Sequence, residues 1–277
     1  MNRTNGSPRI LICRLSAIGD CLLTVPTACP LRDRFPGAFL AWAVGSVPGS
    51  LLAGHAALEE LIVVERDWWK SPTKLWRLVR RLRSLRFDAA IDVQGLTKSA
   101  VLARLSGAKR RIGFAAPIGR EASLWLNNEF VAPHSRHVVD RYRELLGPLG
   151  IDALPPVRFD LPHDRAAETT VARQRTDLKL LGDYAVVNVG AGWGSKVWPA
   201  ESYAHTARHL YARHGLPSLV VWAGPQEREM AETVVRLAGD GATLAPTTSL
   251  AELAAWLRGA KMFVGSDTGP LHLAAAL

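Results

Sequence analysis

The chain has 277 residues, of which 48% are hydrophobic and 21% are charged. These proportions are typical of a soluble globular protein and exclude a disordered chain. No apolar run is long enough to span a membrane, and the polar residues 1–9 predict no signal peptide. Cys13, Cys21 and Cys29 cannot all pair and lack the spacing of metal ligands. We therefore expect buried thiols, no metal site and a cytoplasmic location.

The net charge of +9 is unevenly distributed along the chain. Residues 1–150 hold 22 Lys and Arg against 12 Asp and Glu, a net charge of +10. Residues 151–277 hold 12 against 13, a net charge of −1. The basic first half predicts an anionic partner, which can be nucleic acid, an anionic membrane surface, or a phosphorylated or carboxylated substrate.

Continuous apolar runs alternate with stretches of helical period along the chain. This alternation predicts an α/β protein with parallel sheets that helices cover on both faces. The expected strands are 9–15, 39–44, 61–64, 89–93, 111–114, 184–189, 218–223 and 261–264, and the expected helices include 74–85, 200–214, 226–237 and 250–257.

Glycine and proline cluster in residues 147–165, where the charge balance also changes. This predicts two doubly wound domains, 1–150 and 151–277, with a ligand-binding cleft between them. Residues 271–277 have the pattern of the first turns of a helix. A complete second domain would need a further strand and helix, so we expect this domain to be shortened at its C-terminus.

The segment Leu15-Ser16-Ala17-Ile18-Gly19-Asp20 directly follows the first expected strand. It has only one of the three glycines of a dinucleotide-binding fingerprint, which argues against a Rossmann dehydrogenase. Asp20 would begin a helix, where the helix dipole favours the ionised carboxylate. Such an acid can take a proton from an alcohol, although a helix cap explains the same residue.

Three segments of the second half repeat this strand–turn–helix pattern. In 190–199, three glycines would let the backbone approach a ligand and Lys196 could pair with a phosphate, or the segment is an ordinary loop. In 222–227, Glu227 could accept hydrogen bonds from ribose hydroxyls, or it is a first-turn acid. In 262–273, a helix beginning near Pro270 predicts an anion site for phosphate.

Two further segments of the basic half carry cations. Residues 92–99 end a strand and precede several basic residues that would suit carboxylates or phosphates, although each cation is also explained as a solvated side chain. The helical stretch Lys70–Arg86 has an apolar stripe that packs on a sheet. Its many arginines, with Trp68 and Trp69 before them, also fit contact with anionic lipid headgroups.

Five segments occur in the order Ser16-Ala17-Ile18-Gly19-Asp20, Asp92-Val93-Gln94-Gly95-Leu96-Thr97-Lys98-Ser99, His137-Val138-Val139-Asp140-Arg141, Ser195-Lys196-Val197-Trp198-Pro199 and Ser266-Asp267-Thr268-Gly269-Pro270-Leu271-His272. Taken together and in this order, they resemble glycosyltransferase family 9, the bacterial lipopolysaccharide heptosyltransferases. The segment around Gln94 and that around Arg120 are more similar to heptosyltransferase I than to the enzyme that adds the second heptose.

The resemblance implies a GT-B fold of two facing Rossmann-like domains and metal-independent transfer with inversion at the sugar carbon. It implies no cofactor, an acceptor on residues 1–150 and a nucleotide sugar on residues 151–277. The implied donor is ADP-heptose, and the implied acceptor is the anionic, lipid-linked Kdo–lipid A inner core. This places the enzyme in the cytoplasm, with peripheral contact to the inner membrane, and with no nucleic acid as partner.

The resemblance also implies roles for individual residues. Asp20 would be the general base, and Lys196 with the N–H groups near Thr268 and Gly269 would stabilise the departing diphosphate. Asp267 would orient the donor sugar. The implied donor-binding set is Gly192, Ser195, Lys196, Glu227, Asp267, Thr268 and Gly269, and the implied acceptor-binding set is Gly19, Lys98, Arg120, His137 and Arg141.

Three alternatives remain open from the sequence. The same chemistry could use another nucleotide sugar or glycan acceptor. The isoelectric point near 9.9 would suit a nucleic-acid-binding protein, although no helix-turn-helix or RNA-binding signature is present. A degenerate chain could keep the fold without catalysis, in which case Asp20→Asn would change nothing measurable.

Overall fold

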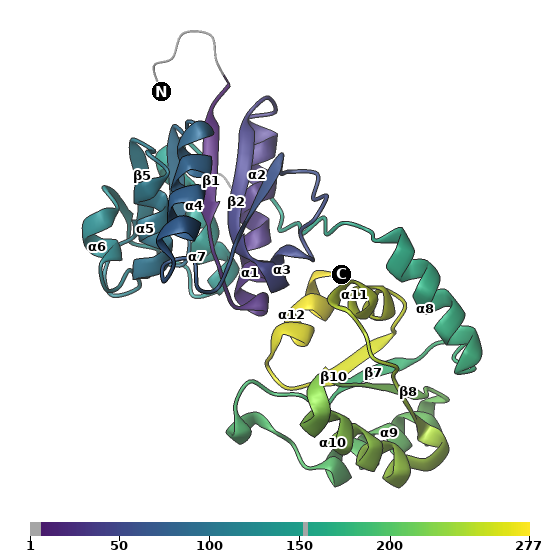
Figure 1. Ribbon diagram of the computed structural model, residues 1–277. Helices are drawn as coiled ribbons and strands as arrows, with labels where there is room; N and C mark the ends of the chain where they lie inside the picture. The colour runs from purple at the N-terminus through teal and green to yellow at the C-terminus, as the bar shows by residue number, and fades with distance from the viewer. Residues whose placement is uncertain (1–6, 152–154) are drawn as a thin grey trace. The chain divides into compact units, whose positions relative to one another are not determined.

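The computed structural model describes residues 7–151 and 155–277. The chain divides into two compact units, Met1–Pro162 and His163–Leu277, called unit 1 and unit 2 below (Figure 1). The sequence analysis places the division after residue 150. The polar start at residues 1–6 lies outside the described residues.

Unit 1 contains a sheet of six parallel strands in the order β3-β2-β1-β4-β5-β6. At its centre, Ile12 of β1 pairs with Trp42 of β2 on one side and with Ile91 of β4 on the other. The strands are β1 (Arg9–Cys13), β2 (Phe39–Gly45), β3 (Glu60–Val64), β4 (Ala89–Asp92), β5 (Arg110–Phe114) and β6 (Glu129–Val131).

Helices cover both faces of this sheet, which explains why its strands are continuously apolar (Figure 1). Leu11 of β1 lies in one buried cluster with Leu82 and Leu102 from two of the helices. Ile10 and Ile12 point to the opposite face, because side chains alternate along a strand. The helices are α1 (Ile18–Thr24), α2 (Ala28–Arg34), α3 (Ser46–Gly49), α4 (Pro72–Ser84), α5 (Thr97–Leu105), α6 (Ser123–Leu126) and α7 (Val138–Glu144).

Unit 2 contains a sheet of four parallel strands in the order β10-β7-β8-β9. Val187 and Val220 pack with Tyr203 and Val234 in its main buried cluster. The strands are β7 (Ala185–Asn188), β8 (Ser218–Val221), β9 (Ala242–Leu244) and β10 (Met262–Gly265), and the helices are α8 (Arg165–Asp177), α9 (Ala200–His214), α10 (Gly224–Ala238), α11 (Leu250–Arg258) and α12 (Gly269–Ala276). Short 3₁₀ turns lie at Val25–Thr27, Gly147–Leu149, Gly194–Lys196 and Gly239–Gly241.

The cysteines are the buried thiols that the sequence predicts. Cys13, Cys21 and Cys29 are all free and buried. Burial raises the pKa of Cys21 and that of Cys29 to about 12. These thiols therefore stay protonated near neutral pH and belong to the packing of unit 1.

Candidate active site

Each sheet has a point at which the order of its strands reverses. In unit 1 this point lies between β1 and β4, and in unit 2 it lies between β7 and β10. Open α/β sheets bind ligands at such points, beyond the carboxyl ends of the strands. The segments that leave these four strands hold Asp20 and Lys98 in unit 1, and Lys196 and Asp267 in unit 2. The topology therefore places these sequence-predicted residues beyond the strand-order reversal of their own sheet.

Asp20 lies in the first turn of α1, just beyond the end of β1. Its Oδ2 accepts a hydrogen bond from the N–H of Ala17 at 3.2 Å and lies 2.7 Å from Nη2 of Arg14. The Asp20 side chain is 43% exposed, whereas that of Arg14 is 8% exposed. Asp20 thus caps its helix and also presents a carboxylate to solvent at the strand end. The geometry is therefore compatible with both sequence-based interpretations of Asp20, a helix cap and a carboxylate that can take a proton.

Arg14 is a residue that the sequence analysis did not single out. Its Nη1 donates to the carbonyl oxygen of Val93 at 3.3 Å, and its guanidinium lies 5.4 Å from the ring centroid of Tyr142. Val93 directly follows β4 and Tyr142 belongs to α7, so Arg14 links Asp20 to both elements. The only sequence signal for this role is an arginine directly after an apolar strand.

The segment after β4 is held in place by a buried carboxylate. Asp92 is fully buried and accepts hydrogen bonds from the N–H of Gly95 at 2.9 Å and from Nδ2 of Asn127 at 3.0 Å. Burial raises the pKa of Asp92, while these hydrogen bonds oppose that rise. Gln94 Oε1 accepts from the N–H of Leu15 at 2.9 Å. The segments after β1 and β4 are therefore locked together.

Two of the predicted acceptor-binding residues lie beside this locked segment. Lys98 is the second residue of α5, and its Nζ lies 5.3 Å from the ring centroid of Trp69. Arg120 donates its backbone N–H to the carbonyl oxygen of Gly95 at 3.0 Å. The structure thus brings Arg120 next to the loop that precedes Lys98.

The other predicted acceptor-binding residues lie on α1 and at the start of α7. The carbonyl oxygen of His137 accepts from the N–H of Arg141 at 3.1 Å, and α7 packs against α1, which carries Gly19. The Nε atom of Arg141 is buried, and no residue within 7–151 or 155–277 pairs with it. His137 and Arg141 therefore share one packed pair of helices with Asp20.

In unit 2, Lys196, Asp267 and His272 form a small charged cluster. Lys196 Nζ lies 2.8 Å from Asp267 Oδ2, and His272 Nε2 lies 3.3 Å from Asp267 Oδ1. The hydrogen bond from Lys196, and then its charge, hold the pKa of Asp267 below its usual range. Ser266 Oγ also donates to the carbonyl oxygen of Lys196 at 2.6 Å. The segments after β7 and β10 therefore meet.

The sequence analysis quoted His272 within a motif but gave it no role. It lies one turn into α12, whose N-cap is Thr268 and whose first residue is Gly269. The first N–H groups of a helix have no acceptor within that helix, so they can bind an anion. His272 follows Thr268 by four residues, which is the spacing that places two side chains on one helix face.

The glycines of the 190–199 segment have different roles. A Cβ atom at Gly190 would lie 2.5 Å from the carboxylate of Glu227, whereas one at Gly192 would meet nothing within 4 Å. A side chain at Gly190 would therefore displace the Glu227 carboxylate, whereas Gly192 and Ser195 lie in an exposed part of the segment. Glu227 Oε2 accepts from the N–H of Ala223 at 2.8 Å. Glu227 thus lies against the start of the segment that carries Lys196.

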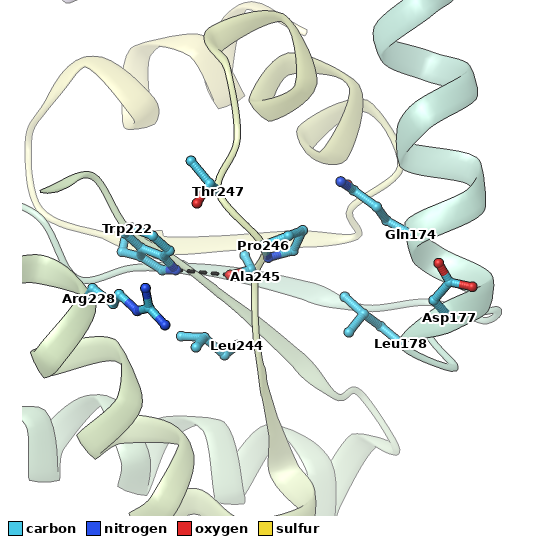
Figure 2. A pocket seen from close by; sticks show the side chains of 9 residues that line it. All are labelled: Gln174, Asp177, Leu178, Trp222, Arg228, Leu244, Ala245, Pro246 and Thr247. Carbon is cyan, nitrogen blue, oxygen red and sulfur yellow. Dashed lines mark hydrogen bonds between the residues drawn. The ribbon is translucent and has the colours of Figure 1, made fainter. Parts of the chain in front are cut away.

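A pocket of about 390 Å³ opens beyond β8 and β9, next to the start of α10 (Figure 2). Trp222 Nε1 donates to the carbonyl oxygen of Ala245 at 2.9 Å, and the guanidinium of Arg228 lies 5.3 Å from the Trp222 ring centroid. The sequence analysis missed this pocket, because residues 244–247 carry no motif. Its lining is Gln174, Asp177, Leu178, Trp222, Arg228, Leu244, Ala245, Pro246 and Thr247.

Neither a metal cluster nor a membrane span is found in the part of the chain that the structure describes. Within residues 7–151 and 155–277, no three His, Cys, Asp or Glu side chains gather as metal ligands do. Over the same residues, no helix combines the length and the apolar character needed to cross a bilayer.

The profile of glycosyltransferase family 9 (heptosyltransferase) matches residues 75–277. The chain belongs to glycosyltransferase family 9. It is 33% identical to lipopolysaccharide heptosyltransferase 1 of Escherichia coli K12 over 97% of this chain and 85% of that protein. It is 31% identical to lipopolysaccharide heptosyltransferase 1 of Pseudomonas aeruginosa over 97% of this chain and 76% of that protein.

Solved structures of family 9 glycosyltransferases share the fold. E. coli heptosyltransferase WaaC with ADP matches with a TM-score of 0.77 at 30% identity, covering 97% of this chain and 84% of that one. The Veillonella parvula family 9 structure matches with a TM-score of 0.85 at 21% identity, covering 99% and 80%, and shows the fold alone.

These findings confirm the family, the GT-B fold class and the enzyme class that the sequence predicts. The chain is a glycosyltransferase that resembles heptosyltransferase 1 of lipopolysaccharide core biosynthesis. The individual site residues stay predictions.

Proposed function

We propose that the chain transfers heptose from ADP-heptose to the Kdo–lipid A inner core, with inversion and without a metal ion. The observation that carries the proposal is the Lys196–Asp267–His272 cluster at the strand-order reversal of unit 2. A second E. coli WaaC structure, with ADP-2-deoxy-2-fluoro heptose, matches this chain with a TM-score of 0.77 at 31% identity, covering 97% of this chain and 85% of that one. That likeness supports the choice of donor.

Unit 2 would hold the donor. The flat Trp222 ring and the apolar floor of the 390 Å³ pocket suit a nucleoside base. Glu227, one residue before the pocket residue Arg228, would accept hydrogen bonds from the ribose hydroxyls.

The diphosphate would lie on the N–H groups at Thr268 and Gly269, beside Lys196. Asp267 would orient the heptose, with Gly192 and Ser195 closing the loop over the donor.

Unit 1 would hold the acceptor and supply the general base. The phosphates and carboxylates of the acceptor suit the cations Lys98, Arg120 and Arg141, with His137 at the same helix pair. The acceptor hydroxyl attacks the anomeric carbon, and its proton passes to the carboxylate of Asp20. As the new C–O bond forms, the bond to the diphosphate breaks and ADP leaves with the electron pair.

Charge develops on the departing diphosphate during this step. Lys196 and the α12 N–H groups would stabilise that charge, because fixed donors aimed at developing charge lower the barrier most. In this mechanism the negative charge needs no metal ion, since an ammonium and a helix N-terminus oppose it.

The donor assignment is tested by thermal unfolding with ADP-heptose, ADP, UDP and UDP-sugars at equal concentration. A ligand that binds only the native state stabilises it by mass action. At a ligand concentration of a hundred times Kd, the free energy of unfolding rises by about 2.7 kcal/mol, and the melting temperature rises with it. We expect ADP and ADP-heptose to raise Tm by several degrees, and UDP compounds to raise it much less.

The matched control is Lys261→Met. Lys261 forms an exposed ion pair with Asp183 at 2.6 Å in the same unit, much as Lys196 does with Asp267. Lys196→Met should lose most of the ADP-heptose shift, and Lys261→Met should keep it. Equal shifts with UDP-sugars and ADP-heptose would contradict the donor assignment.

A further inference from the structure

Arg14 of unit 1 is a buried cation to which the proposed chemistry gives no role. It directly follows β1, and its side chain is 8% exposed. Its backbone is fixed against β2, because its N–H donates to the carbonyl oxygen of Ala43 at 3.2 Å and its own carbonyl oxygen accepts from Nε1 of Trp42 at 3.0 Å. A charge inside a protein needs partners, since its removal from water is costly. The contacts of the guanidinium therefore indicate its role.

Three neighbours surround the guanidinium of Arg14. Nη1 donates to the carbonyl oxygen of Val93 at 3.3 Å, and the ring centroid of Tyr142 lies 5.4 Å away. Nη2 lies 2.7 Å from Oδ2 of Asp20, whose side chain is 43% exposed. Nε is buried, and no residue within 7–151 or 155–277 pairs with it. The cation is therefore anchored by buried groups, and the exposed carboxylate is held by the cation.

The two carboxylate oxygens of Asp20 have different surroundings. Oδ2 faces Nη2 of Arg14 and also accepts from the N–H of Ala17 at 3.2 Å. In the part of the chain that the structure describes, no donor contacts Oδ1. The lone pairs of Oδ1 are thus free to accept a proton from a substrate. Because two contacts fix Oδ2, they also fix the direction in which Oδ1 points.

We propose that Arg14 is a positioning residue for the general base, which holds Oδ2 of Asp20 so that Oδ1 takes the proton of the acceptor hydroxyl. The hydroxyl oxygen keeps the electron pair with which it bonds to the anomeric carbon. This inference rests on the proposed function, in which Asp20 is the base. Arg14 contacts neither substrate and acts by orientation, because a displacement of about 1 Å can slow a reaction about a hundredfold.

The test compares kcat and KM in the parent, Arg14→Met, Asp20→Asn and the double variant, with ADP-heptose and Kdo–lipid A as substrates. Arg14→Met keeps an apolar stem but removes the cation. It should lower kcat by about 10- to 10²-fold and leave KM for both substrates unchanged. The double variant should be no slower than Asp20→Asn alone, because the base that Arg14 positions is already absent.

Arg14→Lys is the conservative variant. It restores a cation beside Asp20, but an ammonium lacks the planar fork that holds Val93 and Asp20 together. Its kcat should lie between that of the parent and that of Arg14→Met. Arg14→Lys also carries the comparison with Asp20→Asn if Arg14→Met does not fold.

The matched control is Arg143→Met on α7. The side chain of Arg143 is 5% exposed, and it lies 3.4 Å from Asp140, which is 43% exposed. The control therefore removes a similarly buried arginine from an equally exposed acid of the same unit. Arg143→Met should keep the kcat of the parent. Any small loss that it causes should multiply with that of Asp20→Asn, since Arg143 does not act through the base.

Two results would overturn the proposal. One is an Arg14→Met enzyme with the kcat of the parent, and a raised KM for the acceptor in that enzyme would make Arg14 an acceptor-binding cation. The other is a double variant whose loss is the product of the two single losses, which would make the role of Arg14 independent of Asp20. Failure of the proposed base is a different result, namely Asp20→Asn with the kcat of the parent.

Discussion

Both units have a reversal of strand order at the candidate site, but the groups that hold the segments beyond it differ in burial. In both, the segment after the first strand contacts the segment after the strand across the reversal. In unit 1 these segments are held by buried groups, since Arg14 is 8% exposed and Asp92 is fully buried. In unit 2 the meeting groups are exposed, with Lys196 at 39% and Asp267 at 64%.

This difference matches the two tasks that we propose. A general base must be held in one geometry to take a proton during the reaction, and buried hydrogen bonds provide that rigidity. A donor site must admit a large nucleotide sugar and then contact it, which suits exposed side chains on a glycine-rich segment. Changes in unit 1 should therefore affect turnover or folding, and changes in unit 2 should affect donor binding.

The largest expected effect is on turnover in Asp20→Asn. An amide cannot take the proton of the acceptor hydroxyl, so kcat should fall by about 10²- to 10⁴-fold. The matched control is Asp33→Asn, which also removes an acid paired with an arginine, Arg158, in unit 1. Initial rates of ADP release check this. A parent that releases no ADP would support the degenerate-chain alternative, and an Asp20→Asn variant with the kcat of an active parent would show that Asp20 is not the base.

Lys196→Met should have the next largest effect. It removes the cation that faces the proposed diphosphate, so kcat/KM for ADP-heptose should fall by about 10²- to 10³-fold. Steady-state rates over a range of ADP-heptose concentrations measure this, with Lys261→Met as the control. A Lys196→Met enzyme with the kcat/KM of the parent would remove Lys196 from the donor site.

Asp92→Asn should change stability. The new amide nitrogen cannot accept a hydrogen bond, so either the N–H of Gly95 or Nδ2 of Asn127 loses its buried acceptor. A loss of about 2–3 kcal/mol in the free energy of unfolding is expected from urea titration. Asp88→Asn, which removes a half-buried acceptor of the Arg9 N–H, should lose less. Equal losses would show that the buried hydrogen bonds of Asp92 contribute no more stability than the half-buried one of Asp88.

The smallest expected effect is a pH dependence at Asp267. Lys196 holds the pKa of Asp267 below the usual value of 3.8, so the pair contributes stability above about that pH. The contribution is lost as the pH falls through the lowered pKa. Because the pair is exposed, the change should be small. Tm of the parent minus Tm of Asp267→Asn should shrink as the pH falls below 3.8, and a growing difference would contradict this sign.

Much of the fold follows from local patterns. All eight strands expected from apolar runs form, with ends that differ by one or two residues. The two strands that the sequence analysis missed, Glu129–Val131 and Ala242–Leu244, have three residues each and lie at sheet edges. So short a run gives no clear period, and only pairing with a neighbouring strand makes it a strand.

The candidate site also has residues that the sequence could predict and residues that it could not. The segments around Asp20, Lys196 and Asp267 are visible because a turn after an apolar run places them at strand ends. Arg14, Asn127 and the pocket lined by residues 244–247 could not be found, because their roles depend on which strand ends are neighbours. That information lies in the strand order, which separate sequence segments do not reveal.

The measurement that tests the division of tasks most directly is ADP-heptose binding by Asp20→Asn and by Lys196→Met, followed in parallel by thermal unfolding. The account predicts that Asp20→Asn keeps the full rise in Tm while it loses turnover, and that Lys196→Met loses most of the rise. Loss of the rise in Asp20→Asn, or a full rise in Lys196→Met, would contradict it.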